Sequence, residues 1–340
     1  MLVIAYPKQY FDYVKSHVSP HRSPQHVRMV DNVESEQILG LLQHAYHSDF
    51  PLVIRGGVSH WPAVGRWSPR HMRQEVGEDA WILLQTGVQE QEASPFINTT
   101  MGAFTEWLER QDDNINMKKS NAPTYYLAEE FDFIEHHAGL VDELGLHDLD
   151  SFWDRKETGL SGLMGWWDGP RRSNSLESLE HSEGFETAFW MGGAGARTGW
   201  HIDHDYPLNV LCHLYGTKTL WIAAPDQGDR MYPSNKYDPG AVLGNVNFWN
   251  PKHDLYPKYR TATYEKIVLE PGDVLFIPMG YWHAAESTTY TASLSLRSMT
   301  SWYWFVNFPD RLLEQLFFQG WWEPSHGSVA IEKTIERKEL

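Results

Sequence analysis

Cysteine is almost absent from this sequence. The 340 residues include one cysteine, Cys212, which excludes an internal disulfide framework and a cysteine-based zinc cluster. A single cysteine suits a reducing compartment, and we expect Cys212 to pack as a small buried hydrophobic residue. A metal bound by this chain would therefore need histidine and carboxylate ligands.

Long apolar runs are also missing. No segment approaches the roughly 18 continuous apolar residues of a membrane-spanning helix. The apolar run at residues 2–6 ends at Pro7 and follows no basic region, so it is too short for a signal peptide. These features predict a soluble, cytoplasmic protein that does not bind membranes.

Basic residues are outnumbered by acidic ones. There are 28 Lys and Arg residues against 45 Asp and Glu residues, which gives a formal net charge of −17. Such a charge repels phosphate backbones, so we expect no general nucleic-acid binding. Hydrophobic residues make up 41% and charged residues 21% of the chain, a balance that is typical of a globular protein and not of a disordered one.

The first third of the chain is predicted to alternate helices with short strands. Leu52–Ile54 is expected to be a buried strand, and a helix begins at Ser68-Pro69 and ends near Gly77. A further amphipathic helix follows Thr100. An earlier helix is predicted to be capped by Ser35 and carries apolar residues at helical spacing, namely Ile38, Leu41, Leu42 and Ala45.

The second half of the chain has a different pattern. Turn-forming residues predict a long surface loop over 165–184. The short apolar runs that follow are separated by Gly, Pro, Asn and Asp, which indicates an antiparallel sandwich or barrel. We therefore expect a mainly β protein with flanking helices: an α/β lead-in over 1–184, a barrel over 185–300 and a C-terminal helical extension over 301–340. The predicted strands are 188–191, 208–214, 217–222, 267–269, 274–277 and 292–297, and a helix is predicted over 310–318.

The segment Trp200-His201-Ile202-Asp203 carries the densest chemical signal. Side chains alternate faces along a β-strand, so His201 and Asp203 can offer ligand atoms to one ion. Far downstream, a turn and strand over 271–278 lead to His283, which an antiparallel barrel can bring across its mouth. Two imidazoles and one carboxylate on one face of an octahedron hold Fe(II) and leave three positions open for oxygen chemistry.

The order of several motifs along the chain carries a resemblance to a known family. From about residue 50 to residue 300 the sequence resembles the JmjC family of iron- and 2-oxoglutarate-dependent oxygenases, and especially the asparaginyl hydroxylase that inhibits hypoxia-inducible factor. The matching stretches are 51–56 (PLVIRG), 60–63 (HWPA), 198–203 (TGWHID), 216–218 (GTK), 250–257 (NPKHDLYP) and 271–283 (PGDVLFIPMGYWH).

The resemblance implies a double-stranded β-helix, which is the jelly-roll barrel of cupins. It implies that His201, Asp203 and His283 bind Fe(II), that 2-oxoglutarate chelates the metal in two positions and that O₂ takes the third. The distal carboxylate of 2-oxoglutarate then needs a cation, and Lys218 matches the family's lysine for that role.

The strand pattern around Lys218 supports an inward position independently. Lys218 alternates with Leu220 and Ile222 on one face, and a lysine buried inside a barrel needs an anion. The alternative is an exposed edge strand with a solvated lysine. Thr198 and Tyr126, chosen over Tyr125, match the hydroxyl groups that bind the same carboxylate in the resembled hydroxylase. Asn209 matches an asparagine near the cosubstrate, although it could equally be a turn residue.

Three departures from the hydroxylase pattern limit the transfer of its substrate. The loop between His201 and Lys218 is two residues longer. Arg297 stands where that hydroxylase has asparagine, on the strand face of Ser293 and Ser295, so Arg297 is a rival anchor for 2-oxoglutarate or a ligand for a substrate carboxylate. Val242-Leu243 replaces a polar pair that binds its substrate.

Other polar and aromatic residues have simpler interpretations. Asp205 shares the face of the predicted ligands but is expected to be a loop carboxylate, and His60, His213 and His253 are expected to be surface or satisfied core histidines. The aromatic clusters 302–305 and 321–322 could belong to the core, or could form a homodimer contact with the C-terminal helix.

The sequence thus predicts an Fe(II)- and 2-oxoglutarate-dependent dioxygenase that hydroxylates a C–H bond and releases succinate and CO₂. A protein or peptide side chain is the favoured substrate, since an acidic surface can steer a basic segment. The alternatives are a free amino acid or natural product, an N-methyl-lysine demethylase, a tRNA-base hydroxylase, and a cupin-like binding protein without catalysis.

Overall fold

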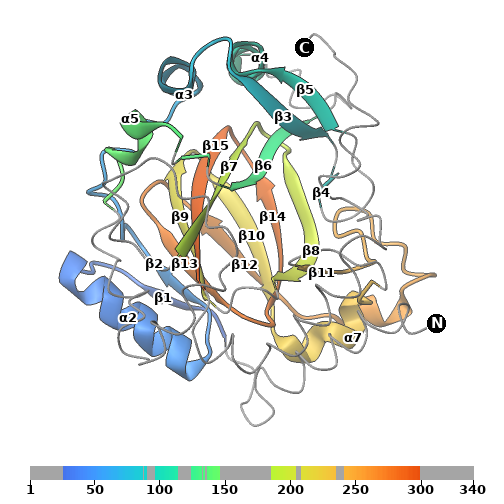
Figure 1. Ribbon diagram of the computed structural model, residues 1–340. Helices are drawn as coiled ribbons and strands as arrows, with labels where there is room; N and C mark the ends of the chain where they lie inside the picture. Colours follow the sequence, from blue (N-terminus) through green and yellow to red (C-terminus); the bar gives the residue numbers. More distant parts are fainter. Residues whose placement is uncertain are drawn as a thin grey trace, which may run out of the picture.

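We describe the protein from a computed structural model (Figure 1), which covers residues 26–86, 88–89, 96–113, 124–131, 133–134, 136–145, 185–203, 208–234 and 241–298. The predicted loop over 165–184 lies outside these residues. So do Asp205, the predicted helix over 310–318 and the aromatic clusters 302–305 and 321–322.

Two β-sheets form the body of the structure, with mostly antiparallel pairing. The larger sheet has nine strands in the order β1 (Arg28–Val30), β2 (Leu52–Ile54), β13 (Val274–Pro278), β9 (Leu208–Tyr215), β15 (Thr291–Ser298), β7 (Phe185–Gly192), β6 (Tyr125–Phe131), β3 (Trp81–Thr86) and β5 (Phe96–Thr100). The smaller sheet has the order β11 (Ala241–Leu243), β8 (Arg197–Asp203), β14 (Trp282–Ser287), β10 (Lys218–Ala223) and β12 (Glu265–Leu269), and β4 (Val88–Gln89) pairs with β8.

The two sheets enclose one apolar interior between them. Leu211, Leu275 and Ile277 come from the larger sheet and pack in the same buried cluster as Leu220 and Ile267 from the smaller sheet. A second apolar cluster covers the outer face of the larger sheet, and a third covers the outer face of the smaller one. This arrangement, with apolar clusters between the sheets and on their outer faces, is the predicted jelly-roll.

The helices lie mainly along the larger sheet. Figure 1 shows α2 (Ser35–Ser48) beside β1 and β2, and α3 (Pro69–Val76) and α4 (Met101–Asp113) near β3 and β5 at the other end. Short helical turns complete the described chain: α5 (Ala138–Val141), η5 (Pro225–Gln227), α7 (Gly228–Met231) and η6 (Pro257–Thr261). None of the helices in the described residues is long and apolar enough to cross a membrane.

The predicted helix boundaries were correct with one exception. Ser68 accepts a hydrogen bond from the His71 backbone, and α3 ends at Gly77, as predicted. The prediction that Ser35 caps α2 was wrong, because the cap is Glu34, whose side chain forms a reciprocal capping box with Gln37. The sequence favours Ser35 as the cap because serine is common at this position and glutamate is unusual there.

The six strands predicted in the second half are all present, as β7, β9, β10, β12, β13 and β15. Strand β14 was missed, although it carries His283.

The Pro-Gly-Asp turn before β13 depends on the backbone conformation of its glycine. Gly272 adopts a φ of 97°, which favours glycine. The Asp273 carboxylate accepts hydrogen bonds from the backbones of Gly56 and Glu270 and from the side chain of Arg55.

A buried polar cluster joins α3 to the segment that follows α5. The Glu143 carboxylate is 7% exposed and accepts hydrogen bonds from Trp67 Nε1 at 2.7 Å and His71 Nε2 at 2.9 Å. Arg66 Nε lies 3.1 Å from the other carboxylate oxygen. Both oxygens therefore have partners within the chain, and we call this group the Glu143 cluster.

Candidate metal centre

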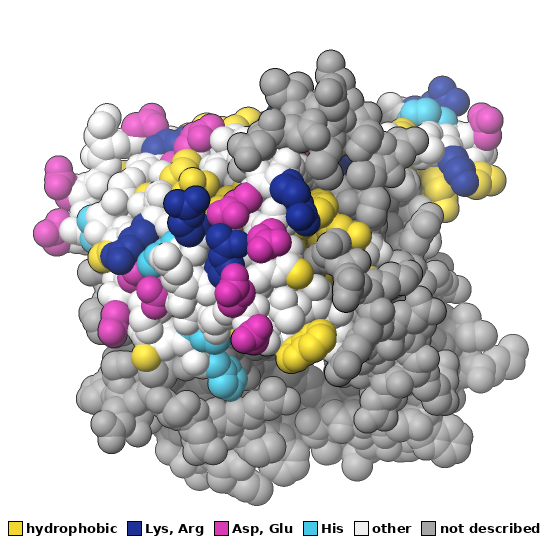
Figure 2. Space-filling view, turned by 90° about the horizontal axis from the view of Figure 1, so that it is seen from above, with side chains coloured by type: hydrophobic (Ala, Val, Ile, Leu, Met, Phe, Trp, Pro, Cys, Tyr) yellow, Lys and Arg dark blue, Asp and Glu magenta, His cyan; other side chains and the backbone are white. Residues whose placement is uncertain are grey.

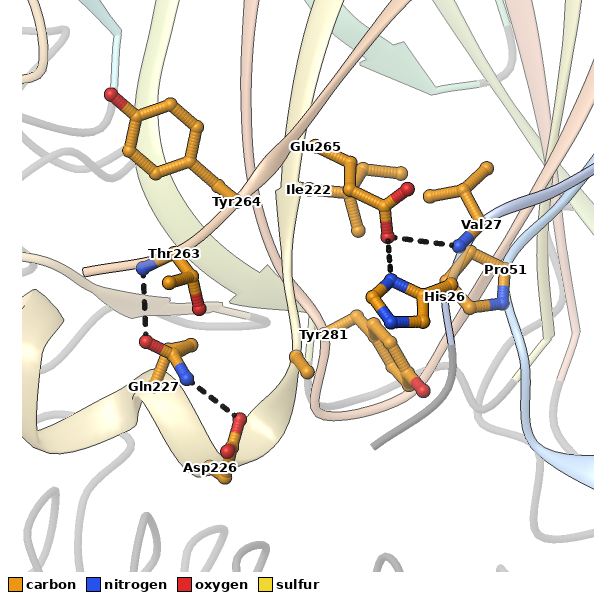
Figure 3. Close-up of a pocket in the computed structure, with 11 residues that line it drawn as sticks. His26, Val27, Pro51, Ile222, Asp226, Gln227, Thr263, Tyr264, Glu265 and Tyr281 are labelled. Atoms are coloured by element: carbon orange, nitrogen blue, oxygen red, sulfur yellow. Dashed lines mark hydrogen bonds and ion pairs between the residues drawn. The ribbon is translucent and has the colours of Figure 1, made fainter. Parts of the chain in front are cut away.

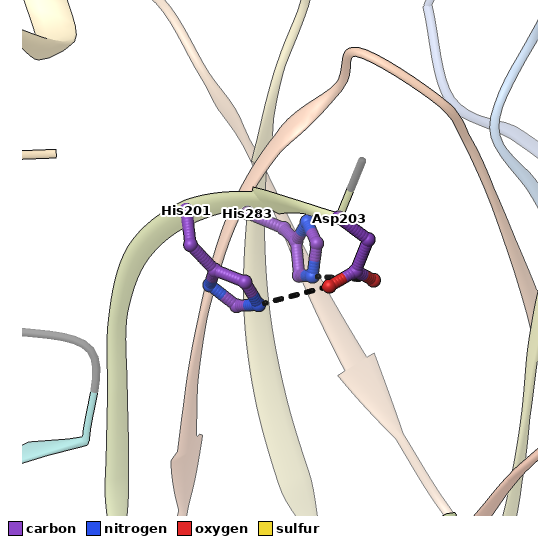
Figure 4. A group of neighbouring side chains, drawn as sticks. All are labelled: His201, Asp203 and His283. Carbon is purple, nitrogen blue, oxygen red and sulfur yellow. Dashed lines mark ion pairs between the residues drawn. The ribbon is translucent and has the colours of Figure 1, made fainter. Parts of the chain in front are cut away.

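Three side chains from two neighbouring strands converge inside the barrel (Figure 4). His201 and Asp203 lie on β8 and His283 lies near the start of β14, where it is the direct register partner of His201. One ligand atom from each lies within 4.8 Å of the others, and all three side chains are buried. Asp203 Oδ1 lies 3.7 Å from His201 Nε2, and Asp203 Oδ2 lies 3.7 Å from His283 Nε2.

Backbone carbonyls orient both imidazoles. His201 Nδ1 is 2.9 Å from the Gly199 carbonyl and His283 Nδ1 is 3.1 Å from the Tyr281 carbonyl. With Nδ1 donating to each carbonyl, Nε2 of each ring carries a lone pair toward the shared space. Burial, with the neighbouring His201, lowers the pKa of His283 to about 3, so the ring is neutral at pH 7 and able to ligate a metal.

The Asp203 carboxylate is surrounded by groups that favour its charged form. Burial opposes ionisation, but Arg297, the two histidines and a hydrogen bond from Asn209 together hold the pKa of Asp203 well below its usual range. Asn209 Nδ2 donates to Asp203 Oδ2 over 2.6 Å, and Arg297 Nη2 lies 4.0 Å from Asp203 Oδ1. The predicted position of Asn209 at the site is thus observed, and its side chain contacts the carboxylate.

Lys218 faces the barrel interior, as the strand pattern predicts. It is 4% exposed, and its ammonium lies 3.3 Å from the Tyr126 hydroxyl, which also hydrogen bonds with Thr198. Burial lowers the pKa of Lys218 to about 7. Among the described residues no carboxylate lies within ion-pair distance of Lys218, so this cation is buried beside neutral partners only.

One cavity connects the metal ligands to Lys218. Its walls include His201, His283, Asn209, Lys218, Tyr126, Thr198, Trp190 and Arg297, with Leu211, Leu220, Ile277, Ala285 and Ser295 as the remaining lining residues. Tyr126 lines this cavity, whereas Tyr125 packs against Trp107 in the core. Of the two tyrosines, Tyr126 therefore lies at the cavity, and its role toward 2-oxoglutarate stays a prediction.

Trp190 is a cavity residue that sequence reasoning missed. Its ring centre lies 5.5 Å from Lys218 Nζ and 5.9 Å from Arg297 Cζ, between the two cations. Its indole Nε1 and the Asn209 Oδ1 are buried without a hydrogen-bond partner. Unsatisfied buried polar atoms are uncommon, and here they line a cavity, which is the expected state of groups that bind a polar ligand. Alternation along 188–191 could have placed Trp190 inside.

Glu129 is a second residue that the sequence did not reveal. It lies on β6 next to a register shift in the pairing with β7, and its backbone adopts a φ of 57°. Its carboxylate accepts a hydrogen bond from Arg297 Nη1 over 2.5 Å. Arg297 is therefore beside the metal ligands, as its strand face predicts, but it is already engaged by one carboxylate and close to a second.

A larger pocket at the protein surface contains none of the candidate ligands (Figure 3). It encloses about 280 Å³ and its lining includes His26, Glu265, Asp226 and Tyr281. Glu265 accepts hydrogen bonds from His26 and from the Val27 backbone, so the Glu265 carboxylate already has partners within the pocket wall. Among the described residues, the group of side chains that could hold a metal ion lies at the smaller cavity.

The remaining predicted residues are structural. Cys212 is fully buried, and His213 is a satisfied core histidine with Ser293 and the Gly216 carbonyl as partners. His60 is exposed. Val242 and Leu243 pair with β8 opposite Ile202 and His201, and both are buried.

Comparisons with known proteins agree with this fold. A family model described as a cupin-like domain matches residues 40–311. The chain is similar to HSPB1-associated protein 1 of Bos taurus, with 23% identity over 270 residues that cover 77% of this chain and 49% of the relative. It is 22% identical over 245 residues to Jumonji C domain-containing protein 5 of Drosophila melanogaster, covering 72% of this chain and 53% of the relative.

A third relative is lysine-specific demethylase 8 of Xenopus tropicalis. The identity is 22% over 258 residues, which cover 75% of this chain and 48% of that protein. The chain spans about half the length of these curated relatives.

Proposed function

The chain belongs to the cupin-like domain family of the JmjC type, and from this premise we propose that it is an Fe(II)- and 2-oxoglutarate-dependent oxygenase. The proposed reaction hydroxylates a C–H bond of a protein or peptide side chain and releases succinate and CO₂. His201, Asp203 and His283 are the proposed iron ligands, and Lys218, Tyr126 and Thr198 are the proposed ligands of the distal carboxylate of 2-oxoglutarate.

The donor set fits iron(II). Two imidazoles and one carboxylate on adjacent strands could bind the metal from one side and leave coordination positions open. Iron held in this way would activate O₂, the oxidant of the reaction: one oxygen atom would go to the C–H bond, and the other to 2-oxoglutarate as it is decarboxylated to succinate. The protein holds the ligands rigidly through the Gly199 and Tyr281 carbonyls and through Asn209.

The buried charge of Lys218 is the observation that carries the proposal. An ammonium group taken out of water without an anion is costly, and the described residues supply no carboxylate to it. A dicarboxylate that reached from the metal to Lys218 would satisfy this charge. The apolar walls formed by Leu211, Leu220 and Ile277 would exclude water from the cosubstrate and strengthen the ion pair.

The contacts favour Lys218 over Arg297 as the anchor. Arg297 hydrogen bonds to Glu129 and lies near Asp203, so its charge is compensated by the chain itself. Lys218 has the Tyr126 hydroxyl as its partner. An incoming carboxylate therefore gains more at Lys218, where it displaces no existing ion pair.

A protein or peptide substrate remains our proposal on the basis of family resemblance and charge. The face shown in Figure 2 mixes acidic and basic side chains, and the part of it that the structure describes shows no extended patch of one sign. Arg66 and Arg73 are paired with Glu143 and Glu109. An N-methyl-lysine demethylase is the second candidate, because one relative is named lysine-specific demethylase 8.

Succinate formation tests the reaction class. Purified protein with Fe(II), ascorbate and 2-oxoglutarate is expected to release succinate, and His201→Ala is expected to abolish this release. Full succinate production by His201→Ala would contradict the metal assignment. An unchanged affinity for 2-oxoglutarate in Lys218→Ala would move the anchor to Arg297.

Mass spectrometry of products from a peptide library then separates the candidate reactions. A gain of one oxygen indicates hydroxylation, and the loss of a methylene unit indicates demethylation. Turnover of free amino acids alone would favour a small-molecule substrate. An absence of turnover with every substrate and with cell extract would favour a cupin-like binding protein.

A further inference from the structure

A guanidinium group lies beside the proposed metal-binding carboxylate. Arg297 is 4% exposed on the inner face of β15, and its Nη2 is 4.0 Å from Asp203 Oδ1. That separation is longer than a hydrogen bond. A buried arginine and a metal cation would compete for the same carboxylate, so a metal site at Asp203 requires something to hold this arginine back.

Glu129 binds the other terminal nitrogen of the Arg297 guanidinium, Nη1. Its Oε1 accepts a hydrogen bond from Arg297 Nη1 over 2.5 Å. The residue lies where the register of β6 against β7 shifts between Leu127 and Glu130, and it has a left-handed φ of 57°. Shifts of this kind re-aim a side chain next to active sites, and an unfavourable backbone conformation persists only where other contacts impose it.

We propose that Glu129 is a positioning residue that holds Arg297 away from Asp203 and so keeps that carboxylate available to the metal. The proposal rests on the metal site of the proposed function. It assigns a role to a pair that the resembled hydroxylase lacks, since that enzyme has asparagine at the position of Arg297.

The physical reason lies in the geometry of the guanidinium fork. Arginine binds carboxylates through two parallel N–H groups, and a buried arginine that loses the charge of one carboxylate is drawn more strongly to the acids that remain beside it. Among the described side chains, Asp203 is the other carboxylate at ion-pair distance from Arg297. Arg297 would then close the 4.0 Å gap and occupy the oxygen that faces His201. Metal binding would have to break this new ion pair first.

Titration of the full chain with Mn²⁺ alone tests the proposal without any turnover. Glu129→Gln is expected to weaken Mn²⁺ binding by about tenfold or more, the range seen when groups that orient metal ligands are lost. Glu129→Asp keeps the charge and should bind nearly as the wild type does. Arg297→Asn should bind at least as tightly as the wild type, and the double variant Glu129→Gln with Arg297→Asn should recover the affinity of Arg297→Asn.

The matched control is a second Arg–Glu pair carried by the same two strands as the ligands. Arg197 on β8 lies 2.7 Å from Glu286 on β14, and Glu286 also accepts a hydrogen bond from Trp249. Glu286→Gln removes a charge of the same sign but should leave Mn²⁺ affinity unchanged. Arg297→Gln is tested beside Arg297→Asn, because glutamine fills more of the space left by the arginine than asparagine does. Thermal melting shows whether each variant is folded.

The outcomes separate the inference from the function on which it rests. No Mn²⁺ binding by the wild type would overturn the proposed metal site itself. Wild-type affinity in Glu129→Gln would overturn only the role of Glu129. A double variant that stays as weak as Glu129→Gln would also overturn it, because the loss would then not pass through Arg297.

Discussion

Two buried polar clusters in this protein differ in whether they are complete. In the Glu143 cluster, one carboxylate oxygen accepts two hydrogen bonds and the other forms an ion pair with Arg66. In the barrel, the imidazole Nε2 atoms of His201 and His283 face Asp203, and Lys218 lies beside neutral groups. A buried cluster that satisfies itself stabilises the fold, whereas one that leaves charge and lone pairs open is arranged for a ligand.

Glu143→Ala should give the largest effect, because it breaks the complete cluster. Removal of the carboxylate leaves Trp67, His71 and Arg66 without their shared acceptor. A buried donor that loses its acceptor costs about 1–3 kcal/mol, and this variant leaves two such donors, Trp67 and His71. We therefore expect a fall of about 2–5 kcal/mol in the free energy of unfolding, measured with urea at pH 7. Mn²⁺ affinity of the folded variant should not change.

The control for this variant is an ion pair nearer the surface. Glu109 is 33% exposed in its side chain and contacts Arg73 at 3.3 Å. Glu109→Ala should cost at most about 1 kcal/mol. A loss in Glu143→Ala no larger than this would show that the complete cluster contributes no more than an exposed pair.

His283→Ala should have the reverse consequence. It removes one of three ligands and should weaken Mn²⁺ binding by more than about 100-fold, beyond the range for groups that only orient ligands. The free energy of unfolding should fall less than in Glu143→Ala, because the ring gives up one hydrogen bond, from Nδ1 to the Tyr281 carbonyl. His213→Gln is the matched control: it disturbs a buried histidine with two partners and should lower stability without loss of metal affinity.

The difference between the clusters also marks what the sequence could predict. His201 and Asp203 stand two apart on one strand, and Lys218 and Arg297 each share a strand face with neighbours two and four positions away, so alternation predicts which side chains point the same way. These local signals predicted the six strands and an antiparallel sandwich or barrel, and the resemblance implied the double-stranded β-helix. The resemblance then supplied the roles of the residues, which periodicity cannot give.

The remaining residues could not be predicted, because their positions depend on distant segments. Glu143 meets Trp67 and His71 across more than 70 positions of sequence. Glu129 reaches Arg297 through a register shift, which breaks the alternation on which the sequence argument relies. Strand β14 was not predicted, because Ala284, Ala285 and Glu286 have little preference for strands.

Lys218→Met should stabilise the protein in the absence of 2-oxoglutarate. Burial lowers the pKa of Lys218 from 10.5 to about 7, so between these values the unfolded chain binds more protons than the folded one. The free energy of unfolding therefore rises with pH between about 7 and 10.5. Below about pH 7 the folded protein bears the full cost of burying a charged lysine. We expect a gain of about 1–3 kcal/mol in the free energy of unfolding at pH 7.

The pH dependence distinguishes this effect from better packing. The advantage of Lys218→Met should shrink as the pH rises toward 10, where the wild-type lysine is neutral in the folded state. Calorimetry should show that the variant no longer binds 2-oxoglutarate. A variant less stable than the wild type at pH 7 would mean that Lys218 has sufficient partners within the chain and that the barrel cluster is complete without a ligand.

Asn209→Ala should produce the smallest effect and tests how finely the open cluster is organised. Asn209 Nδ2 donates to Asp203 Oδ2 over 2.6 Å, and its loss frees the carboxylate to rotate without removing a metal ligand. We expect Mn²⁺ binding to weaken by about tenfold, which corresponds to about 1.4 kcal/mol. Asn245→Ala, which removes a loop amide bonded to the Pro233 carbonyl, should leave binding unchanged. Equal affinity in both variants would mean that the triad is fixed by its strands and the Gly199 and Tyr281 carbonyls alone.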